Sequence, residues 1–256
     1  AMECTYNASD IERVFPKRLP SFMGIEGGHQ LGNSTNEETI LNNLRHFYGS
    51  GVRYMTLTHN CNTFWAQAAN NFEDDYPNVI GLTTFGEQVV REMNKMGMFV
   101  DLSHVAPQTM RDALNVTAAP VIFSHSSAKA VNNNPRNVPD DVLKLLPENG
   151  GLVMVTFVSS FLVANGTATI DDVVKHIDHI KNLIGPDHIG IGGDYDGTPS
   201  TSLPTGLKDV SRYPFLFEAL LKKGYSKEDI IKILGGNLIR AMKKMEQVAR
   251  SLQEQQ

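Results

Sequence analysis

Short apolar runs alternate with amphipathic helical stretches along most of this 256-residue chain. The runs are apolar almost throughout, as parallel strands buried on both faces are. We predict strands at 21–26, 53–58, 98–103, 121–124, 152–157 and 189–193. Helices are predicted between them at 37–48, 85–96, 107–114, 140–146 and 170–184. This order favours βα units around a parallel sheet.

The predicted elements fit one domain. No repeat, low-complexity tract or linker divides the sequence, so we expect a single domain over residues 1–256. From Tyr213 onward the pattern is almost purely helical, with a predicted helix cap at Ser226 and another, earlier in the chain, at Thr169. Six strands are too few to close an eight-stranded barrel. We therefore expect a TIM-like (β/α)8 barrel that lacks one or more strands at its N-terminus.

Composition and charge exclude several classes of partner. The formal net charge is -5 and the Lys and Arg residues are scattered, which argues against binding to nucleic acid. No apolar run is long enough to span a bilayer. Cys4 and Cys61 are the only cysteines, so the sequence has no disulfide framework and no CxxC zinc site. Sequons that would accept glycans in the secretory pathway begin at Asn7, Asn33, Asn115 and Asn165.

A polar residue lies at the C-terminal end of five predicted strands, where a parallel barrel assembles its active site. A lone histidine at such a place is more often structural. Five polar residues in the same phase favour a shared site instead. Imidazole and carboxylate ligands together suit zinc or a similar transition metal. The five candidate residues are Glu26, His59, His104, His125 and Asp194.

Other polar and aromatic residues have competing interpretations. Arg136 follows a loop proline and could clamp a substrate carboxylate, or it is an ordinary surface arginine. Asp101, within a strand, is predicted to be a buried, paired structural carboxylate. His176 and His179 are predicted to lie on a solvated helix face rather than in a second metal site. Trp65 either lines a pocket or packs within a loop.

Six motifs together resemble the membrane dipeptidases. They occur in order between about Ile11 and the C-terminal helices: Gly-Ile-Glu-Gly-Gly-His (24–29), Leu-Thr-His-Asn-Cys-Asn-Thr (57–63), Asp-Leu-Ser-His-Val (101–105), Phe-Ser-His-Ser-Ser (123–127), Arg-Asn-Val-Pro-Asp-Asp (136–141) and Gly-Gly-Asp-Tyr-Asp-Gly (192–197). The resemblance implies a barrel of the metallo-dependent hydrolase type. It also implies a zinc-dependent enzyme that hydrolyses dipeptides.

The resemblance assigns the metal ligands. Glu26 would bridge two zinc ions, and His104 and His125 would complete one of them. Asp194 would serve the other zinc ion and handle the proton while a hydroxide between the metals attacks the peptide carbonyl.

The resemblance also assigns substrate contacts. His59 would hold the developing oxyanion, and Arg136 would bind the terminal carboxylate of the dipeptide. Because a longer peptide has no charge at that position, the enzyme would act only on very short peptides.

The sequence departs from the family pattern at two places. The family's first strand carries a His-x-Asp pair that completes one metal site, and no such pair precedes Glu26. That metal would keep only Glu26 and Asp194, and two carboxylates hold zinc weakly, so we expect this chain to bind one metal well at best. Phe161 stands where the family tends to have a tyrosine, which removes one hydroxyl from the surroundings of the substrate.

Three functions remain open on the sequence alone. The first is an active dipeptidase, extracellular at the cell surface or secreted, with the homodimer and lipid anchor that the resemblance suggests. The second is a catalytically impaired or inactive dipeptidase-like binding protein, because the His-x-Asp ligands are absent. The third is an amidohydrolase of cyclic amides or lactams, whose neutral substrates would not need Arg136.

Overall fold

The computed structural model describes residues 1–15, 17–71 and 76–255. The chain divides into two compact units. Unit 1 consists of Ala1–Ile122 and Ile239–Gln256, and unit 2 consists of Phe123–Leu238. No helix among the described residues has both the length and the apolar character needed to cross a bilayer.

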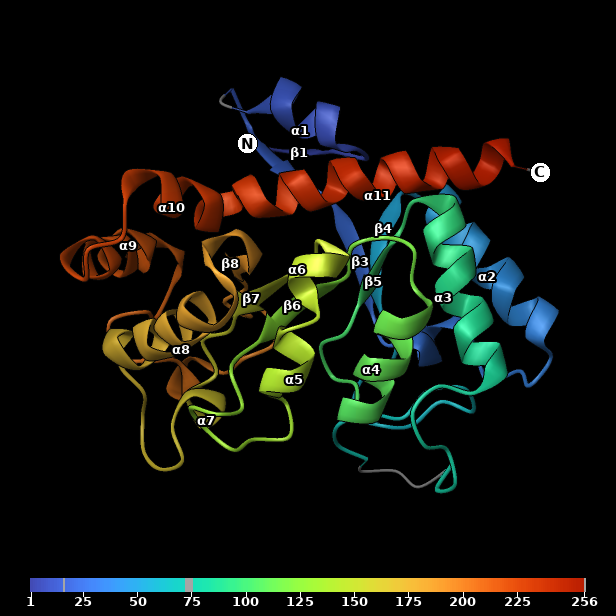
Figure 1. The fold of residues 1–256 in the computed structure, drawn as a ribbon, viewed down its shortest axis with the longest axis horizontal. Helices are drawn as coiled ribbons and strands as arrows, with labels where there is room; N and C mark the ends of the chain where they lie inside the picture. Colours follow the sequence, from blue (N-terminus) through green and yellow to red (C-terminus); the bar gives the residue numbers. More distant parts are fainter. Residues whose placement is uncertain (16, 72–75, 256) are drawn as a thin grey trace. The chain divides into compact units, whose positions relative to one another are not determined.

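Unit 1 is built on parallel strands. Strands β3 (Met23–Glu26), β4 (Val52–Thr56) and β5 (Phe99–Asp101) pair in that order, and Asp101 pairs with Ile122, the first residue of β6 (Ile122–Ser126). The helices that follow these strands lie beside them, with α2 and α3 next to each other (Figure 1). They are α2 (Glu37–Gly49), α3 (Thr84–Met96) and α4 (Pro107–Val116), with the 3-10 helix η1 (Gly28–Leu31) after β3.

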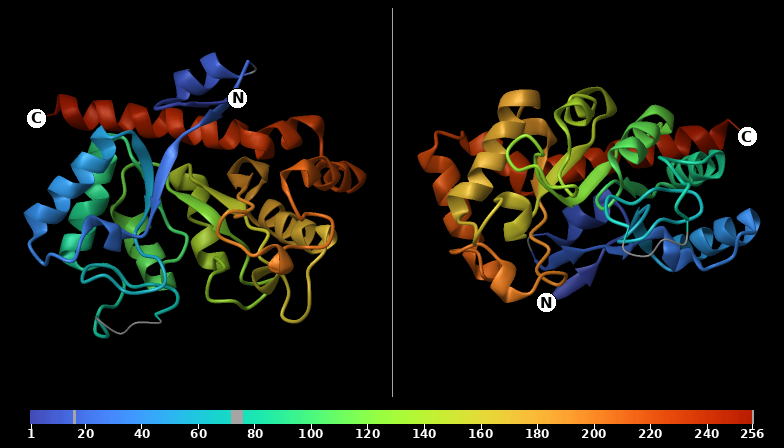
Figure 2. Two further views of the ribbon diagram at one scale, coloured as in Figure 1. Left: turned by 180° about the vertical axis from the view of Figure 1, so that it is seen from behind. Right: turned by 90° about the horizontal axis from the view of Figure 1, so that it is seen from below.

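The N-terminal segment contacts the C-terminal helix within unit 1. Strands β1 (Met2–Cys4) and β2 (Leu19–Ser21) form a separate two-stranded parallel sheet, and α1 (Ala8–Val14) connects them. Figures 1 and 2 show α1 beside the long C-terminal helix α11 (Asn237–Glu254). The backbone N–H of Ala8 donates to Glu246 at 2.7 Å, and Lys243 pairs with Glu12. These contacts fix the N-terminal helix on the C-terminal one.

Unit 2 contains the rest of β6, together with β7 (Leu152–Val155) and β8 (Ile189–Ile191), which pair in parallel. The N–H of Thr156 donates to the carbonyl of Ser126 at 3.2 Å. Helix α8 (Ile170–Ile184) packs on β7 and β8 (Figure 2). The other elements of this unit are shorter: α5 (Asp140–Leu143), α6 (Leu146–Asn149), α7 (Ser159–Leu162), η2 (Pro186–His188), η3 (Ser200–Ser202), η4 (Val210–Arg212), α9 (Tyr213–Lys222), α10 (Lys227–Ile231) and η5 (Lys232–Gly236).

The predicted α/β fold with parallel strands is confirmed, and a strand lies at each of the six predicted places. The caps at Thr169 and Ser226 are also present. The single helix predicted at 140–146 is wrong, because α5 and α6 are separate helices there. Pro147 has no N–H to donate to a preceding turn, so it begins a new helix instead of continuing the old one. Closure of a barrel and the single domain stay predictions.

Candidate metal centre

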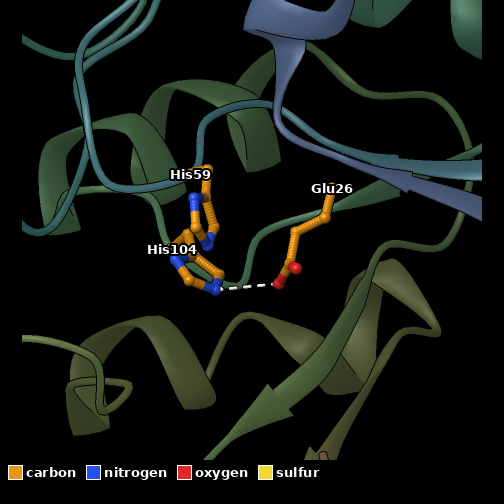
Figure 3. A group of neighbouring side chains, drawn as sticks. All are labelled: Glu26, His59 and His104. Atoms are coloured by element: carbon orange, nitrogen blue, oxygen red, sulfur yellow. Dashed lines mark ion pairs between the residues drawn. The ribbon is translucent and has the colours of Figure 1, made fainter. Parts of the chain in front are cut away.

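Glu26, His59 and His104 lie together in unit 1 (Figure 3). One ligand atom from each residue lies within 4.8 Å of the others. The Nε2 atom of His104 is 3.0 Å from a carboxylate oxygen of Glu26, and the ring centroids of His59 and His104 are 4.5 Å apart. Three of the five predicted strand-end residues are therefore neighbours in space.

Strand register explains why these three side chains meet. Glu26 pairs with Thr56, and Thr56 pairs with Asp101, so the three strands end on one row. His59 comes three residues after Thr56, and His104 comes three residues after Asp101. Equal offsets from aligned strand ends carry the two imidazoles to the same place above the sheet, next to the carboxylate of Glu26.

The backbone at His104 is strained. Among the described residues other than glycine, only His104 (φ 69°) and Asp194 (φ 57°) have left-handed backbone conformations. The Ser103 N–H donates to Asp101 at 3.0 Å, and the Thr58 hydroxyl donates to the His104 carbonyl at 3.1 Å, which together hold the turn. A side chain in this conformation costs free energy and persists where the surroundings impose it, often at functional sites. Both strained residues are predicted site residues.

Gly27 lets the backbone turn directly after Glu26. Its φ of 107° suits glycine alone, and a Cβ atom there would lie 2.4 Å from the His29 ring and 3.0 Å from the Cβ of His59. The two imidazole side chains thus pack against bare backbone. A side chain at position 27 would clash with the His29 ring and crowd the Cβ atom of His59.

The donor set of this group fits a divalent metal ion. It offers one carboxylate and two imidazoles, the ligand types that zinc and related transition metals take. His104 is 5% exposed while the Glu26 side chain is 44% exposed. The group therefore combines a buried histidine with a carboxylate that is open to solvent.

The other predicted site residues lie in unit 2. His125 is buried at the end of β6, with Nδ1 2.8 Å from the Ser124 hydroxyl. Asp194 accepts a hydrogen bond from Thr198 at 3.1 Å, and a Cβ atom at Gly197 would come within 2.5 Å of its carboxylate. Asp194 follows the last paired residue of β8, Ile191, by the same three positions that separate His59 and His104 from their strands. The metal-binding roles of His125 and Asp194 stay predictions.

Arg136 is not a surface residue. It is 5% exposed, and its guanidinium lies 5.0 Å from the centre of the Phe161 ring. Its backbone N–H donates to the side-chain oxygen of Asn134 at 2.9 Å. The surface alternative is therefore wrong. A buried cation stacked on an aromatic ring is pre-oriented to bind a planar carboxylate.

Two predicted assignments are confirmed and one is wrong. Asp101 is fully buried and bonded to the Ser103 N–H, as a structural carboxylate should be. Trp65 is buried in its loop and also lines a cavity of about 320 Å³, so both of its interpretations hold.

His176 is fully buried rather than solvated. The helical spacing of His176 with Val173, Ile177 and Ile180 was the signal that it belongs to the apolar face of α8. His179 is half-buried, and its Nε2 lies 2.8 Å from Asp140.

The parallel strands and the Glu–His–His group define an α/β protein with a candidate metal site at the carboxyl ends of the strands. Residues 1–256 match the family described as membrane dipeptidase (Peptidase family M19). The chain belongs to this family, as the motifs predicted.

Curated relatives include Dipeptidase 3 of Homo sapiens and of Rattus norvegicus, each 48% identical over 233 residues. The alignment covers 91% of this chain and 46% of each relative, so the chain spans about half the length of the curated relatives that it matches.

Solved structures share the fold. A probable dipeptidase from Pseudomonas aeruginosa superposes with a TM-score of 0.88 at 22% identity, over 97% of this chain and 75% of that one. A metallo peptidase from Rhodobacter sphaeroides, liganded with a phosphinate mimic of the dipeptide L-Ala-D-Ala, gives a TM-score of 0.84 at 26% identity. That match covers 95% of this chain and 69% of the other.

Proposed function

We propose that the protein is a zinc-dependent dipeptidase. The observation that carries the proposal is the grouping of Glu26, His59 and His104 within 4.8 Å at the ends of three parallel strands. Family membership supports the same activity, since relatives are named dipeptidases and one similar structure holds a mimic of a dipeptide.

Within unit 1, Glu26 and His104 would hold the metal. Zinc bound there would supply Lewis-acid polarisation of the peptide carbonyl and a lowered pKa for a bound water. His59 would donate a hydrogen bond to the oxygen on which negative charge develops. Its place beside His104 also allows direct binding to the metal. Metal content in a His59→Gln variant separates these roles, because only the second predicts metal loss.

Within unit 2, Arg136 would bind the terminal carboxylate of the substrate, and Asp194 would accept the proton released by the attacking water. His125 is proposed as a further metal ligand, as the family resemblance assigns it. The left-handed backbone of Asp194 and the hydrogen bond from Thr198 hold its carboxylate in one orientation, which suits a group that transfers protons.

The test is metal content together with hydrolysis of a simple dipeptide. We expect the dialysed chain to retain about one zinc ion, because the family's His-x-Asp pair does not precede Glu26. A version supplied with that strand should bind two ions and hydrolyse dipeptides, and chelation followed by zinc should abolish and restore turnover. Absence of both metal and turnover in either version would favour the non-enzymatic binding protein.

We also propose that the natural protein is exposed at the cell surface or secreted, with the homodimer and lipid anchor of the family. Three of the predicted glycan acceptors, Asn33, Asn115 and Asn165, are exposed. Asn7 instead caps α1 through its side chain. Expression through a secretory pathway should therefore yield glycans at the three exposed sites, removable by a glycosidase and visible by mass spectrometry. Unmodified exposed sequons in the secreted protein would contradict the proposal.

A further inference from the structure

His176 joins two segments of unit 2 from within the core. Its Nδ1 accepts a hydrogen bond from the Ala128 N–H at 3.0 Å, and its Nε2 lies 3.0 Å from the Leu162 carbonyl. Because Nδ1 accepts, the ring proton lies on Nε2 and is donated to that carbonyl. Burial lowers the pKa of His176, so the neutral ring that both bonds require is the stable form.

The first segment is the arginine loop, residues 128–138, which carries Arg136. Its ends are closed by a bridge between Ala128 and Val138, with the Lys129 N–H donating to the Val138 carbonyl at 2.9 Å. His176 holds the loop at its first residue. The position of Arg136 therefore depends on where Ala128 is fixed.

The second segment is α7, which contains Phe161, the residue whose ring lies under the guanidinium of Arg136. Amide groups of the arginine loop donate to its carbonyls: Asn137 to Phe161 at 2.7 Å, and Asn134 to Ser160 at 3.1 Å. Asn132 donates to both of these carbonyls at 3.1 Å. His176 bonds the next carbonyl along, that of Leu162. Loop and helix are thus tied to each other directly and to α8 through one imidazole.

We propose that His176 is a positioning residue for substrate binding, which fixes the arginine loop against α7 so that Arg136 lies pre-oriented on Phe161. The inference rests on the proposed role of Arg136 as the carboxylate clamp. A satisfied buried polar network allows few alternative arrangements. A guanidinium held in its binding geometry loses less freedom when the substrate arrives.

The test is a double-mutant cycle on the full chain, read as the Kd of a non-hydrolysable phosphinate dipeptide. His176→Leu removes both bonds and should weaken binding about 30-fold. His176→Gln retains one donor and one acceptor and should weaken binding only about threefold. In an Arg136→Ala background, His176→Leu should cause no further loss, because its effect passes through Arg136. Metal content should stay at the parent value throughout.

His179→Gln is the matched control, one turn further along α8. It loses the contact with Asp140 and should leave the Kd within about twofold. If His176→Leu does not fold, His176→Gln carries the same cycle with its smaller effect. Losses that add in the double variant, or an unchanged Kd in His176→Leu, would overturn the positioning role. An Arg136→Ala variant that binds normally would instead overturn the proposed clamp.

Discussion

In the version supplied with the His-x-Asp strand, replacing Glu26 with glutamine is expected to strip the metal from the protein and abolish dipeptide hydrolysis. Glutamine keeps the shape of the side chain but loses the negative charge that lies 3.0 Å from Nε2 of His104. Changes in groups that only support a ligand cost roughly 10–100-fold in metal affinity, so loss of a direct ligand should cost more. With the Lewis acid gone, turnover should fall by roughly 10³-fold or more. Elemental analysis after dialysis and a dipeptide assay measure both effects.

Glu87→Gln is the control for this variant. Glu87 is also in unit 1, but it forms an ordinary pair with Arg91 on the surface of α3. Such pairs contribute little, so the control should bind metal and fold as the parent does. A Glu26→Gln variant that retains its metal would show that Glu26 and His104 form only an ion pair and that the metal binds elsewhere.

The sequence could predict that three of the candidate site residues meet, because polar residues recur at the ends of the apolar strands. Parallel strands end together, so polar residues at the same offset from each apolar run must emerge at the same edge. The observed register bears this out: Glu26, Thr56 and Asp101 form one paired row, and His59 and His104 each come three residues after it. The same reasoning found six strands, since each is a short apolar run between helical stretches.

What the sequence could not predict depends on contacts between distant residues. Arg136 lies on the ring of Phe161, 25 positions later, and the hydrogen bonds of His176 join it to Ala128 and Leu162, 48 and 14 positions earlier. The left-handed turn at His104 is uncommon for any residue other than glycine, so no local pattern in the sequence predicts it. Strands β1 and β2 have three residues each, too few for any periodic pattern to stand out.

Replacing Arg136 with alanine is expected to raise KM for a dipeptide about 100-fold while metal content stays unchanged. Truncating one partner of a buried charge pair costs roughly 3 kcal/mol, which is about a 100-fold change in affinity. The guanidinium lies buried on the Phe161 ring. Water that fills the space left by the alanine variant therefore cannot bind the substrate carboxylate as well as the guanidinium does. The parent should also discriminate between a dipeptide and its C-terminal amide, whereas the variant should treat the two alike.

Arg212→Ala is the matched control for this prediction, because Arg212 also stacks on a phenylalanine of unit 2, at 5.6 Å from the Phe215 ring, but is exposed. It should leave KM and the preference for a free carboxylate unchanged, which separates the charge at position 136 from arginine stacking in general. Should Arg136→Ala keep the parent KM while the protein opens a neutral cyclic amide, the substrate would have no carboxylate to bind. The cyclic amidohydrolase would then replace the dipeptidase as the better account of the site.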